Sequence, residues 1–254
     1  GSVDAVACTV LDGIPVAVTG SGDGTVRVWD LASGAPIGQP LTGHTGSVDA
    51  LACTVLDGIP VAVTGSGDGT VRVWDLASGA PIGQPLTGHT GSVDALACTV
   101  LDGIPVAVTG SDDGTVRVWN LASGAPIGQP LHTGSVDALA CTMLDGIPVA
   151  VTGSDDGTVR VWNLASGAPI GQPLTRHTNW VNAVACTMLN GIPVAVTGSG
   201  DHTVRVGNLR TGELAGLLAA ADPRALALTV EGDLVLGTGR DVAVFSRRPP
   251  RKPY

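Results

Sequence analysis

Short apolar segments separated by turn signals recur along the whole chain, and residues 46–90 show the pattern clearly. There, SVDALACTV, VAVTGS and TVRVWD are rich in Val, Ala and Thr, and TVRVWD alternates apolar with polar positions as a half-buried β-strand does. Tight-turn signals follow each segment, at Asp57-Gly58, Gly67–Gly69 and Ala77–Gly79. Ala80–Leu86 predicts a short fourth strand. No apolar face of helical period extends over about ten residues, so the pattern predicts a four-stranded antiparallel meander.

The meander is repeated along the sequence. Residues 1–45 and 46–90 are identical except for Val6, which is replaced by Leu51 in the second copy. Further copies begin at Gly91, Gly134 and Asn179, and the copy at Gly91 is two residues shorter. After Arg210 the repeat decays, but apolar runs within 223–246 indicate a sixth, degenerate unit. A period of this length is typical of stacked repeat architectures.

The repeated meanders are expected to pack by stacking on one another. A single meander has two faces to cover, and radial stacking of such sheets into a ring buries both. A β-helical solenoid fits less well, because this repeat is long and turns back several times. We therefore predict an all-β protein, a β-propeller of four-stranded antiparallel blades, with six blades of which the last is incomplete. The expected blades are residues 1–45, 46–90, 91–133, 134–178, 179–221 and 222–246, within one domain (1–246) followed by a disordered basic, proline-rich tail (247–254).

Closure of the ring is the open point of this prediction. The chain begins at a first strand and reaches only three strands in the sixth unit, so blade six is expected to lack its outer strand or to obtain it from the tail or another molecule. An unpaired blade edge would favour self-association.

Composition narrows the classes of partner. The net charge of −9 argues against a nucleic-acid binder, which would present a basic surface to phosphates. No apolar stretch is long enough to cross a bilayer and no signal-peptide pattern is present, so we expect no membrane partner and a cytoplasmic location.

One cysteine occupies the same position in each of five repeats, which predicts separated buried thiols rather than disulfides or a metal cluster. No metal or other cofactor is expected. These cysteines are Cys8, Cys53, Cys98, Cys141 and Cys186.

Two short motifs carry a resemblance to a known family. Trp-Asp ends the third strand at Trp29-Asp30 and Trp74-Asp75, and Gly-His precedes the first strand at Gly43-His44 and Gly88-His89. Together with TGSGDGTVRVWD, these motifs resemble the WD-repeat family, strongly over residues 1–210 and weakly over 211–246. The resemblance implies a β-propeller that holds partner proteins.

In that family a His before strand one, a Ser or Thr in strand two, an Asp in the following turn and a Trp in strand three form a hydrogen-bonded chain. Matching positions here would give three complete structural sets and two incomplete ones. The first repeat lacks the His, and the fifth has His177, Thr197 and Asp201 but Gly207 in place of Trp. The complete sets are His44, Thr64 (or Ser66), Asp68 and Trp74; His89, Thr109, Asp113 and Trp119; and His132, Thr152, Asp156 and Trp162.

Three groups of residues resemble chemical motifs, but each fits a structural role better. A Thr, His and Asp set invites a nucleophile, but it recurs in nearly every repeat without a G-x-S-x-G elbow, so no catalytic residue is predicted. Gly20–Gly24 lacks the following helix that a phosphate cradle needs. Asp112-Asp113 and Asp155-Asp156 lack the calcium-loop pattern, so they are interpreted as turn residues.

The fifth repeat departs from the others at the rim where family members usually bind partners. The uniform repeats carry small or acidic residues there, such as Ser47 and Asp49, which offer little anchoring area. Arg176, Trp180 and His202 replace small residues in repeat five, and we predict that they form a partner-binding patch. Terminal-repeat drift and a Trp180 side chain that folds inward are the structural alternatives.

Three function classes follow from these observations. The favoured one is a non-catalytic protein-interaction scaffold or sensor, suited to one part of a larger signalling protein, whose protein partner the sequence does not identify. The alternative is a multivalent lectin-like propeller that binds a small molecule or glycan once per blade. An enzyme is disfavoured because repeat five adds no nucleophile to Asp201 and His202.

Overall fold

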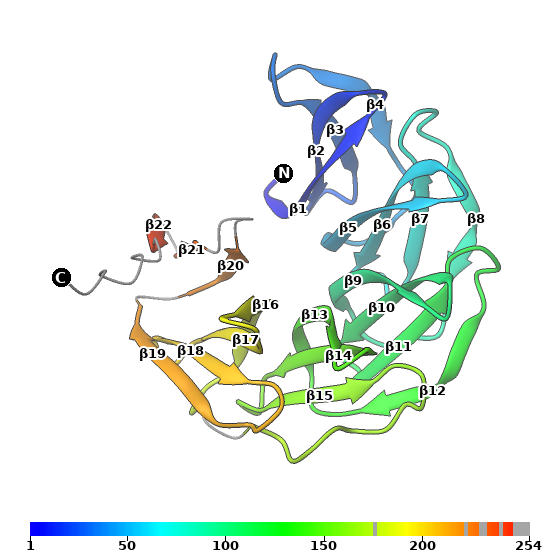
Figure 1. The fold of residues 1–254 in the computed structure, drawn as a ribbon. Coiled ribbons are helices and arrows are strands. Elements are labelled where there is room, and N and C mark those ends of the chain that lie inside the picture. Colours follow the sequence, from blue (N-terminus) through cyan, green and yellow to red (C-terminus); the bar gives the residue numbers. More distant parts are fainter. Residues whose placement is uncertain (175–176, 221–222, 229–232, 239–240, 246–254) are drawn as a thin grey trace.

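The computed structural model describes residues 1–174, 177–220, 223–228, 233–238 and 241–245, which form strands and turns. No helix that could cross a membrane is found among these residues. The strands make six antiparallel sheets in which each strand pairs with its neighbours in sequence. Figure 1 shows the sheets arranged radially, with their first strands toward the centre, so the predicted all-β propeller of six blades is confirmed.

Blades one to three each have four strands, as predicted. Blade one contains β1 (Val3–Leu11), β2 (Ile14–Ser21), β3 (Val26–Asp30) and β4 (Pro36–Leu41). Blade two contains β5 (Val48–Leu56), β6 (Ile59–Ser66), β7 (Val71–Asp75) and β8 (Pro81–Leu86). Blade three contains β9 (Val93–Leu101), β10 (Ile104–Ser111), β11 (Thr115–Asn120) and β12 (Pro126–His132).

The later blades are less regular. Blade four contains β13 (Val136–Leu144), β14 (Ile147–Ser154) and β15 (Val159–Asn163). Blade five contains β16 (Val181–Leu189), β17 (Ile192–Ser199), β18 (Thr203–Asn208) and β19 (Leu214–Ala219). Blade six contains β20 (Ala225–Leu228), β21 (Leu234–Gly237) and β22 (Val242–Phe245).

Two departures from four strands have different origins. In blade four the outer segment pairs with β15 only through the isolated bridges Val159–Leu174 and Trp162–Pro169. The expected fourth strand of this blade is therefore reduced to two bridges. Blade six has three strands in the described residues, as expected for the incomplete last blade. The expected tail at 247–254 lies outside the described residues.

The turn between the first two strands of a blade explains the repeated Asp-Gly pair. Asp12 and Gly13 have φ values of 50° and 82°, and Asp57 and Gly58 have the same values. Two successive residues with positive φ match a type I′ turn, which suits the twist of a tight hairpin. The turn thereby fixes the register of β1 on β2.

The hydrophobic core lies between blades rather than within them. We call the side of a blade that faces the next blade its trailing face, and the side that faces the preceding blade its leading face. In the first interface, Val16 and Val28 on the trailing face of blade one pack with Val48 and Trp74 on the leading face of blade two. The same contact recurs down the chain, so each leading face depends on the blade before it.

Glycine in the second strand permits neighbouring blades to approach closely. A Cβ placed on Gly65 of β6 would lie 2.5 Å from a Cγ of Val93 in the next blade. No side chain larger than hydrogen fits without displacing β9. The glycine of this strand therefore sets the spacing between blades two and three.

The thiols follow the prediction only in part. Cys53, Cys98, Cys141 and Cys186 are partly buried between blades and none of the described cysteines forms a disulfide. Cys8, which was expected to be buried, is exposed because no blade covers the leading face of blade one in the described residues.

Candidate functional site

The family-type hydrogen-bond chain is present in blade two. His44 precedes β5, and its Nδ1 lies 3.1 Å from Asp68 Oδ2 while its Nε2 lies 2.8 Å from Thr64 Oγ1. Trp74 Nε1 donates to the same Thr64 oxygen at 2.9 Å. The network assigns the imidazole proton to Nδ1, since the carboxylate can only accept, and leaves Nε2 to accept from the threonine hydroxyl.

Asp68 receives further donors that fix the turn before β7. The backbone N–H and the hydroxyl of Thr70 donate to Oδ1 at 2.9 and 2.7 Å, and the N–H of Thr45 donates to Oδ2 at 2.9 Å. Burial would raise the pKa of the Asp68 carboxyl, but these hydrogen bonds outweigh it and lower the pKa well below its usual range. Burial also lowers the pKa of His44, so the pair consists of a neutral imidazole and a carboxylate.

The same chain of contacts is repeated in blade three and truncated elsewhere. In blade three His89 lies 2.9 Å from Asp113 and 2.8 Å from Thr109, to which Trp119 donates at 2.9 Å. In blade one Trp29 donates to Thr19 at 2.9 Å without a histidine.

Blade five keeps the histidine but not the indole. His177 lies 3.0 Å from Asp201 and 2.8 Å from Thr197. Gly207 replaces the tryptophan, and a cavity of about 20 Å³ beside it is lined by Leu174, His177 and Thr197. A volume of this size holds about one water molecule.

The expectation for His132 in blade four is wrong. Trp162 donates to Thr152 at 3.1 Å, and Asp156 accepts the N–H and hydroxyl of Thr158. His132, however, is exposed at the end of β12, opposite Thr115, and makes no hydrogen bond with Thr152 or Asp156 in the described part of the chain. The two-residue deletion draws the histidine into the strand and away from the turn, so blade four lacks this member of the set.

The hydrogen-bonded His, Thr, Asp and Trp sets are poorly placed for nucleophilic catalysis. The Thr64 side chain is fully buried, and its oxygen already contacts His44 and Trp74. A nucleophile must reach a substrate atom, and this hydroxyl has no path to one. The geometry supports a structural role in which each set ties the loop before a blade to the blade's second and third strands.

The rim of blade five differs from these repeated sets. The Trp180 side chain is 54% exposed. Its indole lies against Gly200, where a Cβ would collide with it, so only glycine leaves room for this orientation. Asn179 braces the segment, because its amide donates to Gly200 O at 3.2 Å and its Oδ1 accepts the N–H of Trp180 at 2.9 Å. The inward-folding alternative for Trp180 is not the conformation observed.

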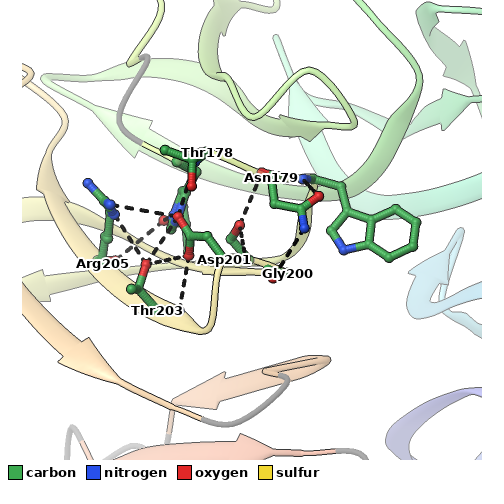
Figure 2. A network of polar contacts seen from close by, with 10 residues as sticks. Thr178, Asn179, Gly200, Asp201, Thr203 and Arg205 are labelled. Carbon is green, nitrogen blue, oxygen red and sulfur yellow. Dashed lines mark hydrogen bonds and ion pairs between the residues drawn. The ribbon is translucent and has the colours of Figure 1, made fainter.

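Figure 2 shows the polar network that holds this rim. Asp201 lies between Thr178, Thr203 and Arg205, and Arg205 approaches its carboxylate at 3.7 Å. Hydrogen bonds from Thr203, His177 and Thr178 outweigh the effect of burial and lower the pKa of Asp201 to about 2. The turn that carries the neighbouring His202 is thereby anchored.

His202 adopts a conformation that favours glycine. Its φ is 63°, and the matching residues of the first four blades are glycines with φ between 76° and 79°. It is exposed on the same rim turn that contains Gly200. Arg176, the third predicted residue of the patch, lies outside the described residues. The structure thus places two of the three predicted residues, Trp180 and His202, on one rim.

A feature of the central channel was not predicted from the sequence. The first strands line a cavity of about 310 Å³ that carries a carboxylate from each of the first four blades, followed by Asn182 and Arg224. The repeated aspartate just after each copy's first valine was the available signal, but only the radial arrangement of the blades brings the copies together. Burial and neighbouring carboxylates raise the pKa of two of them to about 6. The four carboxylates are Asp4, Asp49, Asp94 and Asp137, of which Asp94 and Asp137 are the two with raised pKa.

Radial antiparallel blades, braced internally by His–Asp and Trp–Thr hydrogen bonds, define a WD-repeat β-propeller. The sequence matches the WD40 family, described as WD domain, G-beta repeat, over four segments that together cover more than half of the chain. The chain therefore belongs to the WD40 repeat family. No curated protein matches the chain. The matched segments are residues 5–30, 34–75, 79–120 and 128–163.

Proposed function

We propose that this WD40 propeller is a non-catalytic protein-interaction scaffold that binds a partner protein through the rim of blade five. The observation that carries the proposal is the exposed Trp180 indole, at a position where the first four repeats have serine. Tryptophan offers a large contact area with little loss of side-chain freedom, and it is enriched among residues that dominate binding energy. The rim of the uniform blades offers no comparable anchor.

The bracing of this rim also supports the proposal. Gly200 seats the indole, and the hydrogen bonds of Asn179 and Asp201 hold the two loops that flank it. A side chain that is already held in place loses less entropy on binding. We further propose a cytoplasmic location, which suits a chain whose five cysteines are free.

Replacement of the indole tests this function. The intact chain is used to capture partners from a lysate of its source, and the affinity of a purified partner is measured by calorimetry. Trp180→Ala is expected to weaken binding about 30-fold, as for a hot spot of about 2 kcal/mol. Gly200→Asp, which introduces the residue of blades three and four, is expected to weaken binding by displacing the indole without removing it.

Met188→Ala provides the matched control, because Met188 is about as exposed as Trp180 and lies near the far end of β16, the strand that Trp180 directly precedes. Its affinity should equal that of the wild type. If Trp180→Ala binds as tightly as Met188→Ala while circular dichroism shows an intact fold, the proposal is wrong.

Repeated grooves favour a second candidate function, multivalent binding of a small molecule or glycan. Grooves of about 370 and 400 Å³ lie at equivalent places, between the outer strand of blade three and blade four, and between the outer segment of blade four and blade five. Leu131 lines the first and Leu174 the second. A ligand of this site should bind with a stoichiometry above one per chain in calorimetry against a glycan panel, and a single site per chain would count against it.

A further inference from the structure

The leading face of blade one is uncovered, in contrast to every equivalent face along the array. Val3 is 63% exposed, whereas its counterpart Val48 is 0% exposed. Leu31 is 54% exposed, whereas Leu76 is 4% exposed. Figure 1 shows this side of β1 turned toward the opening of the ring, on the side of blade six. An apolar surface that is buried in all other copies is therefore left open here.

The near-identity of the first two repeats indicates which surface is complementary to this face. Residues 1–45 and 46–90 differ only at Val6 and Leu51, so the leading face of blade one carries nearly the same side chains as that of blade two. In blade two that face is buried against the trailing face of blade one, which presents aliphatic side chains. The side chains of this complementary surface are Leu11, Val16, Val18, Val26, Val28 and Leu41.

We propose that the leading face of blade one is a docking surface for one further β-blade that presents the Leu and Val trailing face of this repeat. The interface would repeat the one already formed between blades one and two. Within this chain, blades one to five have already covered their trailing faces against the next blade. Blade six is a poorer partner for the same surface in a second copy, because its strand register places Asp233 where blade one has Val16, and its described residues include no outer strand to carry a counterpart of Leu41.

This surface is separate from the proposed site on blade five. Trp180 lies on the rim four blades away along the chain, and its role does not depend on whether blade one is covered. The two proposals can therefore fail independently.

Cys8 provides a reporter of docking. It is exposed on β1, and its counterpart Cys53 packs against the interface between blades one and two. Burial raises the pKa of Cys53, Cys98 and Cys186 to about 12, so few of these thiols ionise near neutral pH. Alkylation requires an accessible thiolate, so Cys8 should react first.

The test adds one blade to the intact chain. A second copy of residues 46–90, with its own cysteine replaced (Cys53→Ser within the added copy), is fused before Gly1, which reproduces the natural Thr45–Gly46 junction. Alkylation of each thiol by iodoacetamide is followed by mass spectrometry. Cys8 should react about tenfold more slowly in the fusion than in the original chain.

A matched fusion distinguishes docking from mere attachment. In it the added copy carries Val61→Asp and Val71→Asp, which place charges on its trailing face, and Cys8 should again react rapidly. Slow labelling of Cys186 in both fusions shows that the array stays folded. Equal Cys8 rates in the first fusion and the original chain would overturn the proposal. Cys8 protection that grows with the concentration of the original chain would also overturn it, because a second copy would then occupy the face.

Discussion

At the scale of single residues, one threonine oxygen joins three segments of each complete blade. Thr64 contacts His44 from the loop before β5 and Trp74 from β7, and Asp68 ties that same loop to the turn before β7. Buried polar groups of this kind stabilise little on their own but are costly to leave unpaired. Removal of the Asp68 carboxylate should therefore destabilise the fold mainly because His44 and the N–H of Thr45 lose their acceptor.

Blade four supplies the matched comparison for this role. Asp156 caps the same turn but has no histidine partner. Asp68→Ala is expected to lower the free energy of unfolding by about 2 kcal/mol more than Asp156→Ala, because it also removes the acceptor of the buried His44 Nδ1–H and of the Thr45 N–H. Urea denaturation followed by tryptophan fluorescence measures both losses, and equal losses would contradict this account.

His202 allows a second prediction at this scale. A side chain in the left-handed region costs about 1 to 2 kcal/mol relative to glycine. His202→Gly should therefore raise stability by about 1 kcal/mol, and Gly69→His in blade two should lower it by a similar amount. Thermal unfolding of the two variants checks this pair. No gain in His202→Gly would show that the histidine's own contacts offset the strain.

At the scale of elements, local patterns predicted nearly every strand of the first five blades and the Asp-Gly hairpin turns, because both depend on neighbouring residues. The position of His132 and the outer segment of blade four were mispredicted. His132 depended on how a two-residue deletion is absorbed, which the repeat pattern alone does not specify. The open leading face around Cys8 and the carboxylates of the channel depend on ring geometry, which brings together residues far apart in sequence.

The spacing between blades gives a prediction for these elements. Gly65→Ala places a methyl group against Val93 and should lower stability by about 1 to 3 kcal/mol through overpacking. Gly216→Ala in β19 is the control, because its Cβ would meet Val206 at 3.6 Å, an ordinary contact. Chemical denaturation of the two variants should separate them, and equal stabilities would contradict close blade packing.

At the scale of the whole molecule, the ring brings together like charges that are far apart in the sequence. Asp94 and Asp137 project from successive blades into the channel. Burial is the main cause that raises the pKa of each to about 6, and nearby carboxylates raise it further. Because these values exceed the usual value of 3.8, the unfolded state favours the charged carboxylates. Their contribution to stability is present below about pH 4 and is lost as pH rises through about 6.

Asp94→Asn isolates this effect. The variant should match the wild type near pH 4 and exceed its stability by about 1 kcal/mol near pH 7, a value reduced for solvent screening of a half-buried group. Asn182→Asp should show the reverse, a loss near pH 7 that disappears near pH 4, because it extends the carboxylates to blade five. Urea unfolding at both pH values measures these differences, and differences that do not change with pH would contradict this electrostatic account.

The central claim, that the blade-five rim binds a partner protein, is tested most directly by site-specific photocrosslinking. A photoreactive amino acid is placed at position 202 and, in a separate chain, at the equivalent position 69 of blade two, and adducts are identified by mass spectrometry. The account predicts one discrete protein adduct from position 202 that disappears with Trp180→Ala and is absent from position 69. Equal adducts from both positions, or an adduct unaffected by Trp180→Ala, would contradict it.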